Sequence, residues 1–145
     1  MLKKSIAVTL LVSLFAVSGC VEGVSMYETP GAMAGPPAGM ARIIVYRPAE
    51  MMGAGVQPVV RVGQRETGRC APNGVFSIDV APGEHNVSAT TEVTSAVLVE
   101  LDAGEVAYIR CGIGFGFFVG QPRLTLVERS IGRGESANLV LTEAY

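Results

Sequence analysis

The stretch VFSIDVAPGEHNVSATT, residues 75–91, contains the clearest fold signal in this chain. Every second side chain in its first half is apolar: Phe76, Ile78 and Val80. Such alternation is typical of a strand with one buried face. Pro82 and Gly83 suit the two central positions of a type II turn, and a second extended run follows. The stretch therefore predicts a strand, a tight turn and another strand.

The same pattern recurs on both sides of this stretch. AVLVELDAGEVAYIRCGI, residues 96–113, predicts two strands around a turn at 102–104. ARIIVYRP, residues 41–48, is apolar on both faces, which indicates a strand covered on both sides. Further strands are expected in VQPVVRV, residues 56–62, and RLTLVE, residues 123–128.

No segment after residue 40 shows a sustained helical period, so we predict one all-β domain over residues 41–145. Seven or eight short strands with regular turns favour a small antiparallel β-sandwich. The tail ESANLVLTEAY, residues 135–145, fits either a strand or a short helix.

The first twenty residues predict export and lipidation. Lys3 and Lys4 precede a charge-free run over residues 6–17, which is typical of a secretory signal and too short for a permanent membrane span. The end of this segment, VSGC, resembles the lipobox of bacterial lipoproteins. That resemblance implies a signal peptide at 1–19 and acyl chains on Cys20. Val21, in place of the Asp typical of inner-membrane retention, favours the outer membrane.

Residues 20–40 are rich in Gly, Ala and Pro, so beyond the lipidated Cys20 we expect a flexible tether. An extended chain of this length spans about 60–70 Å at roughly 3.3 Å per residue.

The charge balance after the signal excludes several functions. Residues 20–145 contain nine Arg, no Lys and thirteen Asp and Glu, so no basic stripe is available for a nucleic acid. Without a lysine there is no Walker-type phosphate loop, Schiff base or Ser-Lys dyad.

Catalytic and metal sites are also poorly supported. His85 is the only histidine and lies one residue beyond the predicted Pro-Gly turn, where we expect it to be solvated. Glu100, Asp102 and Glu105 surround another turn, and a catalytic carboxylate pair there is the weaker alternative to a solvated turn. CxxC, HExxH and acidic calcium-loop patterns are missing from the sequence. We expect no enzyme, no cofactor and no metal.

CGIGFGFFVGQP, residues 111–122, leaves two interpretations open. Its glycines miss the GxGxxG spacing and no helical pattern follows, so it does not predict a nucleotide loop. The favoured interpretation is a glycine-kinked strand whose rings close one end of the core. The alternative is an exposed apolar patch for a partner or a membrane. Neighbouring strand residues face opposite ways, so at least one ring is expected to be exposed. The residues concerned are Phe115, Phe117 and Phe118.

Three motifs carry a resemblance to a known family: ARIIVYRP at 41–48, APGEH at 81–85 and FVGQP at 118–122. In this order they resemble an uncharacterised family of bacterial lipoproteins built on a small β-sandwich, and the Pro-Gly turn is similar to that of PEGA-like repeats. The resemblance covers about residues 41–128. It implies a fold and an envelope location, and it supplies no activity and no site residues.

Cys70 and Cys111 remain once Cys20 is assigned to lipid. In an oxidising compartment we favour a disulfide between them, with a buried Cys111 and a free Cys70 as the alternative.

Two functions follow from the sequence. The favoured one is a lipid-anchored, non-enzymatic binding or structural module of the bacterial cell envelope. It contacts a protein partner through a sheet face or through the segment with Phe115, Phe117 and Phe118, here called the Phe loop. The alternative is an accessory carrier that binds a small apolar ligand or lipid.

Overall fold

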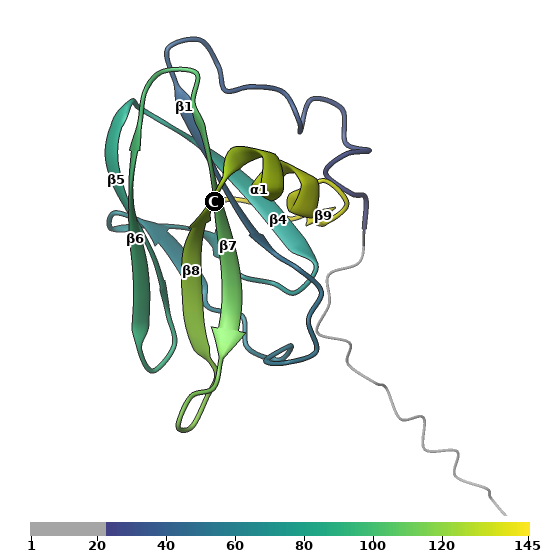
Figure 1. The fold of residues 1–145 in the computed structure, drawn as a ribbon, viewed down its shortest axis with the longest axis vertical. Helices are drawn as coiled ribbons and strands as arrows, with labels where there is room; N and C mark the ends of the chain where they lie inside the picture. Colours follow the sequence, from purple (N-terminus) through teal and green to yellow (C-terminus); the bar gives the residue numbers. More distant parts are fainter. Residues whose placement is uncertain (1–22) are drawn as a thin grey trace, which may run out of the picture.

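The computed structural model describes residues 23–145, which form two facing β-sheets and one short helix (Figure 1). The five-stranded sheet has the order β8 (Gln121–Val127), β7 (Val106–Gly114), β1 (Ala41–Arg47), β4 (Gly74–Val80), β9 (Val140–Leu141). The four-stranded sheet has the order β3 (Arg65–Arg69), β2 (Val59–Val62), β5 (Gly83–Thr90), β6 (Thr94–Leu101). The helix α1 covers Arg129–Ser136.

The predicted two-sheet β architecture is confirmed, and both predicted strand-turn-strand units are present as β4–β5 and β6–β7. The pairing differs from a wholly antiparallel arrangement at two places. The strand β1 runs parallel to β7, and β9 runs parallel to β4. These parallel pairs join segments far apart in the sequence, so no hairpin pattern predicts them.

The main core lies between the two sheets. Ile43 and Val45 of β1 point into it, opposite Val87 and Ala89 of β5, and all four are buried. Phe76 of β4 also belongs to this core, as the alternating pattern of its strand predicts.

The two cysteines cross-link the sheets within this core. The sulfur atoms of Cys70 and Cys111 are 2.11 Å apart and the two Cα atoms 6.2 Å apart, so the pairing that the sequence left open is formed. Cys70 follows β3 in one sheet, and Cys111 belongs to β7 in the other.

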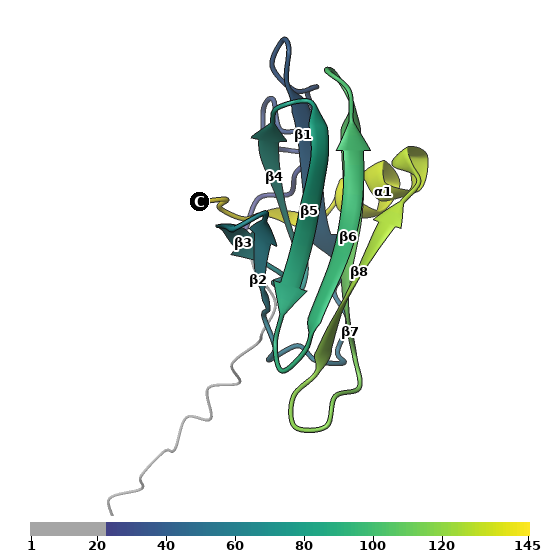
Figure 2. The same ribbon diagram turned by 90° about the vertical axis from the view of Figure 1, so that its left-hand side faces the viewer.

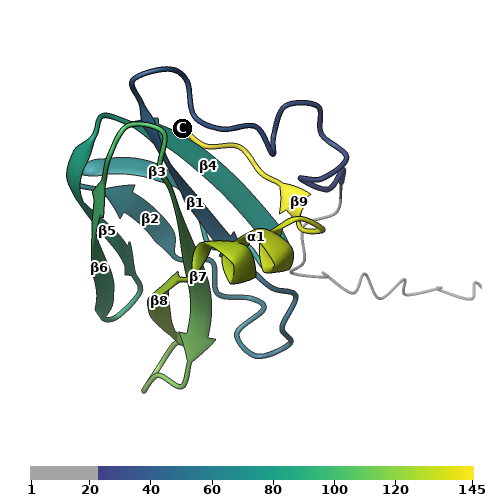
Figure 3. The same cartoon turned by 45° about the horizontal axis from the view of Figure 1, so that its top comes forward.

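A second, smaller core covers the outer face of the five-stranded sheet (Figure 3). Ile44 and Tyr46, on the other face of β1, pack there with Tyr108. The expectation that β1 is covered on both sides is therefore correct. Figure 3 shows α1 and the segment before β1 on this same side of the sheet, away from the four-stranded sheet.

The expectation of a flexible tether is wrong for the part of it that the structure describes. The side chain of Met26 is buried in the second core, and its backbone N–H donates to the carbonyl of Leu139 at 2.7 Å. The next N–H, of Tyr27, donates to Ala137 at 2.8 Å, and Ser25 forms a β-bridge with Val140. The Gly, Ala and Pro content gave no sign of this packing, because one buried side chain and a few backbone hydrogen bonds to the C-terminal segment hold it in place. Cys20 and the predicted signal at 1–19 lie outside the described residues.

The C-terminal tail contains a short strand, β9, and only the last two residues of a helix, α1. Most of α1 lies before the tail, at 129–134, where the sequence predicted no helix. Glu128 caps α1, because its carboxylate accepts hydrogen bonds from the backbone N–H groups of Ser130 and Ile131. The bonds to Ser130 lower the pKa of Glu128.

Neither α1 nor any other helical segment in residues 23–145 is long and apolar enough to cross a membrane.

Candidate functional site

An apolar surface, here called the apolar tip, occupies the end of the molecule where β7 turns into β8 (Figures 1 and 2). The exposed fractions of its three rings are 85% for Phe115, 87% for Phe117 and 86% for Phe118. Exposed aliphatic side chains complete the apolar tip: Met51, Met52 and Val119. The favoured expectation that the rings close the core is therefore wrong. Beyond Gly114 the chain leaves both sheets, so no second sheet faces the rings. Phe117 and Phe118 pack edge to face on each other, with ring centroids 4.9 Å apart.

Hydrogen bonds from the β5–β6 turn fix the conformation of the Phe loop. The Glu92 carboxylate accepts from the backbone N–H groups of Phe117 at 2.8 Å and Phe118 at 3.3 Å. The Thr91 hydroxyl donates to the carbonyl of Gly120 at 3.0 Å. A side chain at Gly116 would not fit, because its Cβ would lie 1.5 Å from the carbonyl oxygen of Val119. The backbone of the Phe loop is therefore hydrogen-bonded to the β5–β6 turn, while its three aromatic side chains are exposed to solvent.

The loop that carries Met51 and Met52 is fixed by a buried arginine. The Arg47 guanidinium, only 1% exposed, donates to the carbonyls of Val56 at 2.6 Å and Gly53 at 2.8 Å. It also donates to the backbone carbonyl of Cys70 at 3.0 Å, so the same guanidinium contacts both this loop and the residue that forms the disulfide.

The loop after β1 packs against the end of β7, beside the Phe loop. Gly53 has a φ of +67°, and a Cβ on it would lie 2.5 Å from Ile113 Cγ2. Met52 lines the same shallow hollow as Phe115 and Phe118. The hollow therefore joins the loop after β1 and the Phe loop in one apolar surface.

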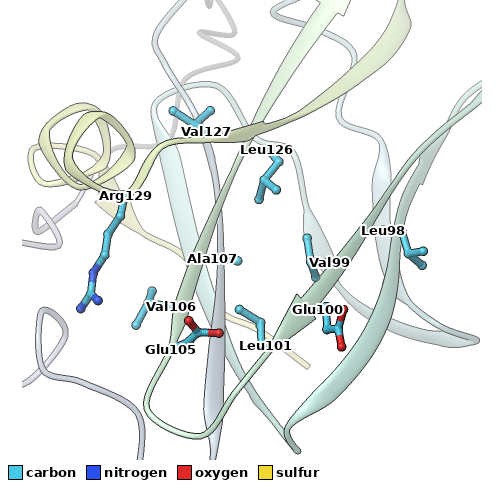
Figure 4. A pocket seen from close by; sticks show the side chains of 10 residues that line it. All are labelled: Leu98, Val99, Glu100, Leu101, Glu105, Val106, Ala107, Leu126, Val127 and Arg129. Carbon is cyan, nitrogen blue, oxygen red and sulfur yellow. The ribbon is translucent and has the colours of Figure 1, made fainter.

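A second candidate site is a cleft between the edge strands β6 and β8 (Figure 4). Figure 2 shows these strands meeting near the apolar tip and separating toward the opposite end. They meet where the backbone N–H of Leu124 donates to the Ser95 hydroxyl at 3.0 Å. Where they separate, a cleft of about 340 Å³ opens.

Leu126 shows that this cleft is an opening into the sandwich. In the β7–β8 pair Leu126 lies directly opposite Ile109, a residue of the main core, so both side chains share the inward face. Ile109 is fully buried, yet Leu126 is 52% exposed. Figure 4 shows Leu126, Val99 and Leu101 around the gap, with charged side chains at its margin: Glu100, Glu105 and Arg129.

The candidate catalytic groups lie at the end of the sandwich away from the apolar tip, in or beside its turns, and two of them, Glu100 and Glu105, also border the cleft. The His85 Nε2 is 2.7 Å from the carbonyl oxygen of Ala81, within the β4–β5 connection. One Glu105 carboxylate oxygen accepts from the backbone N–H of Asp102 at 2.7 Å, and Glu100, Asp102 and Glu105 are all exposed. Among residues 23–145, no three His, Cys, Asp or Glu side chains gather as metal ligands would.

A polar network that the sequence did not predict lies on the outer face of the five-stranded sheet. The Tyr46 hydroxyl donates to the Glu135 carboxylate at 2.5 Å, and Arg110 Nε lies 3.5 Å from the same oxygen. Burial, followed by the hydrogen bond to Glu135, raises the pKa of Tyr46. Glu135 belongs to α1, so the network fastens the helix to the sheet. The only sequence signal was a tyrosine on a strand already expected to be covered on both sides.

The fold and these sites define a small two-sheet β-domain with an apolar tip and an open edge. A family described as a protein of unknown function, DUF2846, matches residues 37–121, which is more than half of the chain. The chain belongs to this family. The match includes β1–β7 and the Phe loop, and it ends at the start of β8. Comparisons with curated proteins and with solved structures gave no match.

Proposed function

We propose that this chain is a lipid-anchored, non-enzymatic binding module of the bacterial cell envelope that acts through protein-protein contact. In this proposal acyl chains on Cys20 hold the domain on the outer membrane. The Cys70–Cys111 disulfide supports an exported domain, since disulfides persist in oxidising compartments.

We choose the contact surface from the exposure of the Leu126 side chain. A large side chain on the inward face of a sandwich is normally buried against the opposite sheet, whereas Leu126 faces the open cleft. The cleft is bordered by β6 and β8, which are both edge strands of their sheets. An edge strand offers backbone groups for pairing with an extended segment of another protein. We therefore place the partner segment along this edge, with one apolar side chain packed against Leu126.

Site-specific photocrosslinking in intact cells tests this surface. A photoreactive residue at position 126 should capture one discrete protein, which mass spectrometry identifies. A photoreactive residue at Gln64, exposed in the β2–β3 turn, is the matched control and should not capture it. Capture of the same protein from both positions would contradict a specific role for the cleft.

The cleft also supports a second candidate, a carrier of a small apolar ligand or lipid. Its volume of about 340 Å³ lies near the lower end of the range typical of small-molecule sites, which is roughly 300–1,000 Å³. Native mass spectrometry of the purified protein should then reveal a bound small molecule, and Leu126→Glu should remove it by placing a charge in the apolar wall. A ligand-free wild-type protein that still captures its partner would contradict the carrier function.

The anchor has its own test. Cys20→Ser should leave an unacylated chain that no longer enters the detergent phase, because the thioether to the lipid cannot form. Intact-mass measurement of the wild type should show the added acyl chains. Equal partitioning of the two proteins would refute the lipid anchor.

A further inference from the structure

We infer that the apolar tip is a second membrane contact, which lies in the surface of the same bilayer that holds the acyl chains of Cys20. This inference rests on the proposed lipidation and adds an orientation of the domain. The residues involved are Met51, Met52, Phe115, Phe117, Phe118 and Val119.

The chain between the lipid anchor and the domain is short, which keeps the domain close to the membrane. Only Val21 and Glu22 separate Cys20 from Gly23, where the described structure begins. Three residue steps extend at most about 10–11 Å. Because Ser25 and Met26 are already bound to the domain, the folded part cannot stand away from the membrane. The first residue bound to the domain, Ser25, is five steps from Cys20, so the beginning of the domain lies within about 17–18 Å of the anchored Cys20.

The position of the apolar tip identifies the face that meets the membrane. Figure 1 shows the first described residues on the right-hand side of the molecule and the β7–β8 loop at its lower end. The loop after β1, which carries Met51 and Met52, lies between them along the lower right. A plane that faces the lower right therefore meets the beginning of the domain and the apolar tip together.

The internal hydrogen bonds of the tip suit a lipid environment. In a bilayer, backbone polar groups without a partner are costly, so a contacting loop has to satisfy them within the protein. Glu92 accepts from the amides of Phe117 and Phe118, and Arg47 binds the carbonyls of Met52 and Gly53. Two backbone amides of one loop and two backbone carbonyls of the other are therefore satisfied within the protein.

The charges near the tip define the kind of bilayer surface. The loops 48–58, 91–93 and 114–120 contain no basic residue and two carboxylates, Glu50 and Glu92. One exposed basic side chain lies beside them, since a Cβ on Gly114 would be 2.8 Å from Arg123 Nε, and the two carboxylates outnumber this single positive charge. Contact with lipid therefore depends on apolar burial, and anionic headgroups should not strengthen it. The preferred surface is zwitterionic phospholipid.

A single tryptophan provides the test, because the chain contains none. The full-length acylated protein with Phe117→Trp is reconstituted into vesicles of phosphatidylethanolamine and phosphatidylcholine with brominated acyl chains. Its emission should shift to shorter wavelength and lose roughly half of its intensity, since an inserted tip reaches about 5–10 Å into the headgroup and acyl boundary. Phe117 is exposed, so the substitution leaves the core intact.

The matched control is Ala103→Trp, on the exposed β6–β7 turn at the opposite end of the sandwich, which should be neither shifted nor quenched. Replacing part of the lipid by phosphatidylglycerol should not increase quenching at position 117.

An unquenched Trp at position 117 in acylated, vesicle-bound protein would overturn the inference while the anchor stands. Equal quenching at both positions would overturn the orientation, and a wild-type chain without acyl groups would overturn both proposals. A photoreactive residue at position 117 that captures a protein in cells, and no lipid, would show that the tip binds a protein instead.

Discussion

Phe76 and Phe117 place the same side chain in opposite environments, one in the main core and the other on the apolar tip. Phe76 lies on a strand that is paired within its sheet and faces the second sheet, and it is 1% exposed. Phe117 lies in a loop beyond the ends of both sheets and is 87% exposed. Among residues 23–145, the one buried phenylalanine is therefore the one that a second sheet faces.

The largest expected effect comes from removing the buried ring. Phe76→Ala should lower the free energy of unfolding by about 3–5 kcal/mol, because it removes apolar burial and leaves a cavity. Chemical denaturation followed by circular dichroism measures this loss. A loss below about 1 kcal/mol would mean that the core around Phe76 is not closely packed.

Removal of the disulfide tests the covalent link between the two sheets. The double variant Cys70→Ala/Cys111→Ala should be less stable by about 4 kcal/mol on the chain-entropy account, since the bond closes a loop with a sequence separation of 41 residues. The wild type before reduction should show no thiol at these positions that reacts with an alkylating reagent. Two reactive thiols would rule out the bond.

Tyr46→Phe tests the polar network under α1. Loss of the hydrogen bond to a charged carboxylate should cost about 1.5 kcal/mol at neutral pH. The folded state raises the pKa of Tyr46 above its ordinary value of 10.0, so its contribution is complete below pH 10 and is lost as the pH rises further. Denaturation at several alkaline pH values should show this loss in the wild type and a smaller one in Tyr46→Phe. An identical loss in both proteins would exclude the phenol as its source.

The smallest effect on stability is expected at the apolar tip. Phe117→Ser should change the free energy of unfolding by less than about 0.5 kcal/mol, because the ring has almost no neighbours to lose. Thermal denaturation beside Phe76→Ala gives the direct comparison. A loss near 3 kcal/mol at position 117 would place the ring in the core after all.

The strands that carry regular alternation were predictable from the sequence. In β4, Phe76 and Val80 are buried as expected, because in a paired strand the backbone geometry fixes which side chains share a face. The Phe loop and the N-terminal segment were not predictable in the same way. Gly-rich sequence has no such period, so the environment of Phe117 or Met26 depends on which distant segments lie nearby.

The sequence by itself determined the two-sheet β class, the turns, the candidate disulfide pair and the lack of basic or metal-binding patterns, because these follow from local spacing and composition. Only the tertiary structure decided that β1 pairs with β7, that Met26 packs on the sheet, and that Leu126 faces an open cleft. Each of these features joins segments distant along the chain. Their energies come from the fit between surfaces that meet only after folding, which no local pattern encodes.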